Sequence, residues 1–239
     1  MSVIPSDSAR LADANKTRRP RPNLAVRGGI TPGWTPVAGL LCLAILAFAA
    51  ITPFDRFIYD HFTYKRTEIE DWHRLFRIAG YIPTWLLVAA VLYIQLGRRA
   101  RIGLWHPAKI LFIPILAAAA LSEVLKVISK RHRPEVGEGA YTWRPWADDF
   151  LSTSGIGLPS GHAATAFAAA FILTRLYPKS LPIWAILGLG CAATRLLTGS
   201  HFTTDLVVSA TIGYAIARTV WYYAHPPQSP TASPVSKNS

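Results

Sequence analysis

Cysteine and acidic residues are both scarce in this chain of 239 residues. Its two cysteines, Cys42 and Cys191, lie far apart inside apolar segments. That placement argues against a disulfide framework and against a cysteine-based metal site, so we expect two small core side chains. The 13 Asp and Glu residues form no cluster that suggests a metal ion, and 25 Lys and Arg outnumber them. We therefore expect neither a metal nor another cofactor.

The strand-like alternation of apolar and polar residues is missing as well. Hydrophobic residues make up 51% of the chain and occur in long blocks rich in Ala, Leu and Ile. A helix that crosses a bilayer needs about 20 mostly apolar residues, and it satisfies its own backbone hydrogen bonds in lipid. Six blocks approach this length: 36–53, 81–97, 108–127, 162–177, 181–198 and 204–224. The sequence therefore predicts an all-α fold, a bundle of six transmembrane helices in one domain.

The net charge of +12 is unevenly divided by this predicted topology. One side of the membrane receives 14 Lys and Arg and 2 acidic residues, and the other side receives 11 of each. The more basic side is normally cytoplasmic. We therefore expect a multi-pass protein of the bacterial inner (cytoplasmic) membrane, with a membrane domain at 35–224 between disordered cytoplasmic tails, a basic one at 1–34 and another at 225–239. Attraction to anionic lipid explains the charge, so no nucleic-acid partner is expected.

Three short stretches place ionisable residues beside apolar blocks. They read KVISKRHRP (126–134), PSGH (159–162) and TRLLTGSHFTTD (194–205). Because successive spans alternate in direction, the third and fifth helices end at the face where the fourth and sixth begin. The three stretches are therefore predicted to meet in an active site at one membrane face, which is the side facing the periplasm or exterior.

The residue types in this predicted cluster favour a phosphate group. Lys126, Arg133 and Arg195 supply three cations, and the planar arginine fork matches phosphate oxygens. Ser160 and Gly161 precede a helix, whose free N–H groups and dipole favour an anion. We interpret these five residues as a phosphate-binding set.

Two histidines complete the predicted site. His201 and Asp205 are four residues apart, so they face the same way on a helix. A carboxylate bonded to one imidazole nitrogen leaves the other nitrogen free to attack. His162 is placed to protonate a leaving alkoxide. The predicted chemistry is a two-step phosphoryl transfer in which His201 attacks phosphorus and water then hydrolyses the phosphohistidine.

Together the stretches read Lys-x6-Arg-Pro, Pro-Ser-Gly-His and Thr-Arg-x5-His-x3-Asp. This pattern resembles the tripartite signature of the type-2 phosphatidic acid phosphatase superfamily, and the resemblance to its membrane branch covers roughly 36–224. It implies that the two histidines serve as nucleophile and acid. The third motif usually opens with serine, where this chain has Thr194 and keeps the hydroxyl. The six apolar blocks argue against the soluble acid phosphatases and vanadium haloperoxidases of the superfamily.

The resemblance implies a metal-independent phosphatase whose partners are the bilayer and a phosphorylated lipid that enters sideways. The expected substrate is a lipid phosphomonoester or diphosphate such as phosphatidic acid, phosphatidylglycerol phosphate, undecaprenyl diphosphate or lipid A phosphate. A lipid-to-lipid phosphotransferase is the first alternative. A membrane transporter or lipid-binding protein is the second, although transporter sites tend to lie near the bilayer midplane.

Structural roles are alternatives for some of these residues. Glu123 lies three residues before Lys126, so the two are also spaced to form an ion pair on a helix. The loop at 135–158 is interpreted either as a lid or headgroup selector, or as a connector anchored in the membrane interface by its tryptophans.

Overall fold

The computed structural model describes residues 35–64, 70–102 and 104–225, and nearly all of their regular structure is helical. Its elements, in chain order, are α2 (Thr35–Ile51), η1 (Thr52–Phe54), α3 (Asp55–Phe62), α4 (Asp71–Ile78), α5 (Ile82–Leu96), α6 (Pro107–Ser129), α7 (Gly161–Leu176), η3 (Pro178–Ser180), α8 (Leu181–Leu197) and α9 (Thr203–Ala224). Within these described ranges only isolated β-bridges occur and no strand forms. The all-α prediction is confirmed.

Each of the six predicted apolar blocks overlaps one long helix, namely α2, α5, α6, α7, α8 or α9. Three stretches are long and apolar enough to cross a membrane: Ala38–Phe62, Pro107–Ser129 and Pro178–Leu197. The pair α4 and α5, bent by 60°, adds a fourth if it counts as one broken span. Helix α7 has 16 residues, fewer than the about 20 that a straight span needs. The structure therefore has three or four candidate spans.

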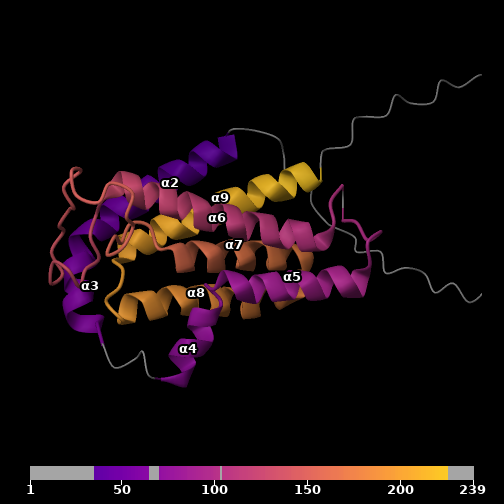
Figure 1. Ribbon diagram of the computed structural model, residues 1–239, viewed down its shortest axis with the longest axis horizontal. Helices are drawn as coiled ribbons and strands as arrows, with labels where there is room; N and C mark the ends of the chain where they lie inside the picture. Colours follow the sequence, from indigo (N-terminus) through magenta and orange to yellow (C-terminus); the bar gives the residue numbers. More distant parts are fainter. Residues whose placement is uncertain (1–34, 65–69, 103, 226–239) are drawn as a thin grey trace, which may run out of the picture.

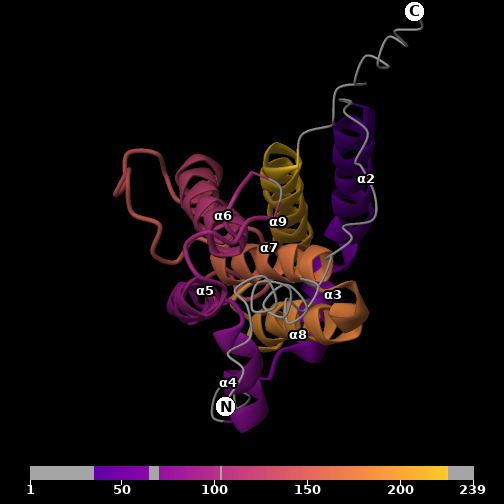
Figure 2. The same ribbon diagram turned by 90° about the vertical axis from the view of Figure 1, so that its right-hand side faces the viewer.

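Helix α7 forms the centre of the bundle, between α6 and α9 on one side and α8 on the other (Figures 1 and 2). Four of its alanines, Ala163, Ala164, Ala168 and Ala169, have no exposed surface. Small residues allow helices to approach closely. At Gly213 of α9, an added Cβ would lie 2.8 Å from the Ala164 carbonyl oxygen and 2.8 Å from the Ala168 nitrogen. The glycine thus lets α9 touch the backbone of α7.

The link between α4 and α5 packs against the beginning of α7. An added Cβ on Gly80 would lie 2.7 Å from Cβ of His162 and 2.9 Å from Sγ of Cys191. The Trp85 indole donates a hydrogen bond to the Ala79 carbonyl at 2.8 Å, which holds the link in place. Cys191 is buried as expected, whereas Cys42 is exposed on α2, so its assignment to the core is wrong.

The ends of α6 and α8 lie at the same end of the bundle as the beginnings of α7 and α9, on the left in Figure 1. The loop between α6 and α7 covers that end and folds back on itself. Its backbone is tied by hydrogen bonds from Arg144 N to the Lys130 carbonyl (2.9 Å) and from Gly157 N to the Arg131 carbonyl (2.8 Å). This loop and four helix ends form the frame of the site.

Candidate active site

The three motif-bearing stretches meet at this end of the bundle. Lys126 lies in the last turn of α6 and Arg195 in the last turn of α8. His162 is the second residue of α7, and Asp205 lies in the first turn of α9. His201 lies in the short connection between α8 and α9. The alternation of helix direction brings these residues together, as the sequence predicts.

The N-terminus of α7 presents unpaired polar groups toward the cation from α6. Ser160 precedes the helix without capping it through its side chain, and its buried hydroxyl has no hydrogen-bond partner among the described residues. An added Cβ on Gly161 would lie 3.6 Å from Oε1 of Glu123 and 3.9 Å from Nζ of Lys126. The free N–H groups of a helix start and a nearby ammonium both attract an anion. This corner of the site is suited to an anionic group.

Lys126 already has an acidic neighbour. Its Nζ lies 2.6 Å from Oε1 of Glu123, and the Lys126 side chain is buried while that of Glu123 is half-exposed. The ion pair suggested by their spacing is therefore present. A phosphate bound at Lys126 would approach this carboxylate, so Glu123 sets a limit on the negative charge that the corner accepts.

His201 is held in one tautomer by a backbone carbonyl. Its Nδ1 lies 2.8 Å from the Gly157 oxygen and 3.4 Å from Oδ2 of Asp205. A carbonyl can only accept, so Nδ1 carries the hydrogen and Nε2 carries the lone pair. Burial lowers the pKa of His201 despite the opposing hydrogen bond and charge of Asp205. The neutral, nucleophilic form of the imidazole is thus favoured. Of the two contacts of Nδ1, the one with the Gly157 carbonyl is shorter than the one with Asp205, and Gly157 was not predicted as a site residue.

Asp205 is shared by three partners. Besides its contact with His201, its carboxylate accepts a hydrogen bond from Phe202 N at 2.9 Å, which caps α9. Its other oxygen pairs with the guanidinium of Arg131, and both side chains are buried. Arg131 also donates to Oγ1 of Thr204 at 2.9 Å. The carboxylate of Asp205 is therefore oriented by Arg131, a residue of the first stretch that was not among the predicted site residues.

A second buried carboxylate extends this network. Asp55, at the start of α3, is 1% exposed and accepts hydrogen bonds from the Thr204 hydroxyl and from the Tyr141 hydroxyl, the latter at 2.8 Å. Burial and the hydrogen bond to Asp55 raise the pKa of Tyr141 to about 12, so the phenol stays a donor at neutral pH. Neither Asp55 nor Arg131 was predicted. For Asp55 the reason is that its contact with Thr204 joins residues 149 apart, which leaves no local pattern in the sequence.

The remaining predicted cations lie near the histidines. Arg195 is 8% exposed, and its charge acts on both His162 and His201. The two imidazoles also act on each other. Arg133 is half-buried, with Nη1 3.5 Å from Glu135, and its charge acts on His201. Two imidazoles and several cations are therefore grouped around one location.

The first motif is joined to the third through Gly157. An added Cβ there would lie 3.1 Å from Oδ2 of Asp205 and 3.2 Å from Cα of Arg133. Arg133 N also donates to the Gly155 carbonyl at 2.9 Å. The loop backbone thus fits tightly between the motifs, and a side chain at position 157 would require its neighbours to shift by a few tenths of an ångström.

Comparison with known proteins identifies relatives of this arrangement. The family model of the PAP2 superfamily matches residues 107–228, which contain all three motifs. Decaprenylphosphoryl-5-phosphoribose phosphatase from two strains of Mycobacterium tuberculosis (CDC 1551 / Oshkosh and ATCC 25618 / H37Rv) is 28% identical over 136 residues, covering 57% of this chain and 69% of the relative.

A solved structure shares the fold. It is a transmembrane PAP2 type phosphatidylglycerolphosphate phosphatase from Bacillus subtilis, with a TM-score of 0.55 and 18% sequence identity. The match covers 80% of this chain and 96% of the other. At 18% identity this likeness shows the fold alone. Membership of the family is shown by the family model, which matches more than half of the chain. The chain belongs to the PAP2 superfamily, which includes membrane phosphatases.

Proposed function

We propose that the protein is an integral membrane lipid phosphatase that hydrolyses a lipid phosphomonoester or diphosphate through a phosphohistidine. The observation that carries the proposal is the environment of His201, which is buried, with Nδ1 bound to the Gly157 carbonyl and Nε2 left as the basic nitrogen. Burial lowers the pKa of His201, which favours the neutral imidazole. Both relatives named above are phosphatases, and their names contain a lipid-linked phosphate.

In the first step, Nε2 of His201 attacks phosphorus while the bond from phosphorus to the lipid oxygen breaks. His162 donates a proton to that oxygen, and the dephosphorylated lipid leaves as an alcohol or as a lipid with one phosphate fewer. The positive charge that develops on His201 is stabilised by the buried carboxylate of Asp205. Arg131 keeps this carboxylate in place.

In the second step, water attacks phosphorus and the bond to Nε2 breaks. His162, now neutral, takes the proton of the water, so both histidines return to their starting states with release of inorganic phosphate. Lys126, Arg133, Arg195, the Ser160 hydroxyl and the N–H groups that follow Gly161 stabilise the negative charge in both transition states. Because these groups supply the positive charge, the proposed reaction needs no metal ion.

The proposed topology has six spans, with the candidate site at the face away from the cytoplasm. Helix α7 would cross as a short central span, shielded from lipid by α6, α8 and α9. The proposal keeps the membrane domain at 35–224, the flanking tails at 1–34 and 225–239, and the inner membrane as location. The loop at 135–158 carries exposed Trp143 and Trp146, which suit anchors in the interface beside an entering headgroup.

The test is phosphate release by the purified protein in detergent with chelator present. Phosphatidic acid, phosphatidylglycerol phosphate, undecaprenyl diphosphate and lipid A phosphate form the substrate panel. At least one should release phosphate, and His201→Gln should abolish the release while His61→Asn, an exposed histidine on α3, should not. Full activity of His201→Gln would refute the mechanism. Labelled phosphate that appears on a second lipid and not in water would assign the phosphotransferase alternative.

A further inference from the structure

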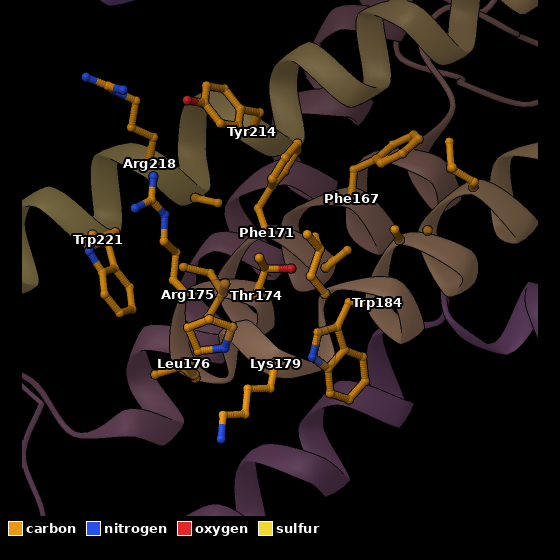
Figure 3. A pocket seen from close by; sticks show the side chains of 18 of the residues that line it. Phe167, Phe171, Thr174, Arg175, Leu176, Lys179, Trp184, Tyr214, Arg218 and Trp221 are labelled. Carbon is orange, nitrogen blue, oxygen red and sulfur yellow. The ribbon is translucent and has the colours of Figure 1, made fainter. Parts of the chain in front are cut away.

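A large cavity lies along the seam of α7, α8 and α9, extending toward the end of the bundle opposite the candidate active site (Figure 3). Its volume is about 1070 Å³. That is at the upper limit of pockets that enclose drug-sized ligands, and it exceeds what a small ion needs. None of the predicted catalytic or phosphate-binding residues lines it.

The long wall of the cavity is hydrocarbon and aromatic. Phe167 and Phe171 project from α7, and Trp184 projects from α8 (Figure 3). The indole nitrogen of Trp184 is buried and has no hydrogen-bond partner among the described residues. Because this nitrogen has no accessible surface, it offers no polar contact to a ligand, and the wall fits a ligand that is mainly apolar.

Two arginines stand at one rim of the cavity. Arg175, in the last turn of α7, and Arg218 of α9 extend toward the same side, together with the hydroxyl of Tyr214, whereas Lys179 points the other way (Figure 3). Neither arginine forms an ion pair or hydrogen bond with another residue of the described ranges. Arg175 is exposed and Arg218 is half-buried, so both guanidinium groups are accessible to a ligand at the rim.

We propose that this cavity binds one anionic phospholipid, with its phosphate between Arg175 and Arg218 and an acyl chain against the aromatic wall. Arginine forks match phosphate oxygens, and the apolar wall accepts the chain. The occupant belongs to the leaflet opposite the candidate active site, so it is distinct from the substrate. The inference rests on the membrane insertion proposed above and does not depend on the phosphohistidine chemistry.

The test uses native mass spectrometry of the purified protein titrated with phosphatidylglycerol or phosphatidylcholine of identical acyl chains. We expect one tightly bound phosphatidylglycerol and at least about tenfold weaker retention of phosphatidylcholine, since charge-assisted hydrogen bonds distinguish the headgroups. Arg175→Gln/Arg218→Gln should remove this preference. Arg98→Gln/Arg99→Gln, which loses the same charge from exposed positions near the same end, should keep it.

Two further variants locate the lipid. Thr174→Phe adds bulk inside the cavity. It should weaken the retention of both phosphatidylglycerol and phosphatidylcholine while leaving the preference between them unchanged. Arg195→Gln removes a cation of the candidate active site and should leave the retention of phosphatidylglycerol unaltered, even where phosphate release is lost. Equal retention of the two lipids by the wild type, or wild-type retention by Arg175→Gln/Arg218→Gln, would overturn the proposal.

Discussion

Arg131→Met removes the cation from the buried pair with Asp205, and we expect a large loss of stability. Arg131 is 4% exposed and Asp205 is fully buried, so the change leaves a carboxylate that water cannot reach. Removing one partner of a buried ion pair costs about 3–5 kcal/mol, because the remaining charge is uncompensated. Denaturant titration of the protein in detergent measures the free energy of unfolding.

The double variant Arg131→Met/Asp205→Asn distinguishes this cause from simple loss of packing. With both charges gone, no buried charge remains unpaired. The loss of unfolding free energy in the double variant should therefore be smaller than the sum of the losses in the two single variants, by about 0.5–3 kcal/mol. Phosphate release should not return, because the partner of His201 is also gone.

Lys130 provides the matched control for this cycle. It is as buried as Arg131, but its ammonium donates to the backbone carbonyls of Phe150 and Asp149, with no carboxylate partner in the described ranges. Lys130→Met should therefore show no coupling with Asp205→Asn. Coupling of the same size in both cycles, or none in the Arg131 cycle, would refute the argument.

Three more predictions follow from the same contacts. Because burial lowers the pKa of His201 and the neutral form attacks, kcat/KM should fall with acid only below the ordinary histidine value of about 6.5; a fall that begins above it would contradict the assignment. Tyr141→Phe removes a donor from buried Asp55 and should lower the free energy of unfolding by about 1–3 kcal/mol, measured by denaturant titration, and an unchanged value would count against the network. Gly213→Leu forces α9 away from the Ala164 carbonyl and should lower the unfolding temperature in detergent, whereas an unchanged temperature would show that the helices are not so close.

The sequence was sufficient to predict the six long helices and the convergence of the three stretches, whereas the short helix α3 was not predicted. Long apolar blocks mark helices directly, and the block predicted at 162–177 is observed as the helix Gly161–Leu176. Alternating helix direction then brings His162 and His201 to the same end. Six membrane crossings do not follow from composition in the same way, because α7 is too short to qualify alone and α9, with 22 residues, is not among the candidate spans.

The supporting contacts were beyond the reach of sequence reasoning. The carbonyl of Gly157 sets the tautomer of His201, and a backbone atom leaves no signature in residue type. Arg131 lies in a run of several cations, where no spacing distinguishes the one that pairs with Asp205. The link from Asp55 to Thr204 depends on how α3 packs against α9, which is a tertiary property.

The covalent intermediate is the most direct test of the mechanism. Trypsin cleaves after Arg195 and Arg218, and the peptide between these sites contains His201 as its one histidine. We predict that alkaline quenching during turnover of a phosphate-labelled lipid leaves label on this peptide, and that His201→Gln abolishes it while His61→Asn retains it. Label on the peptide that carries His162, or steady turnover with no labelled histidine, would contradict the account.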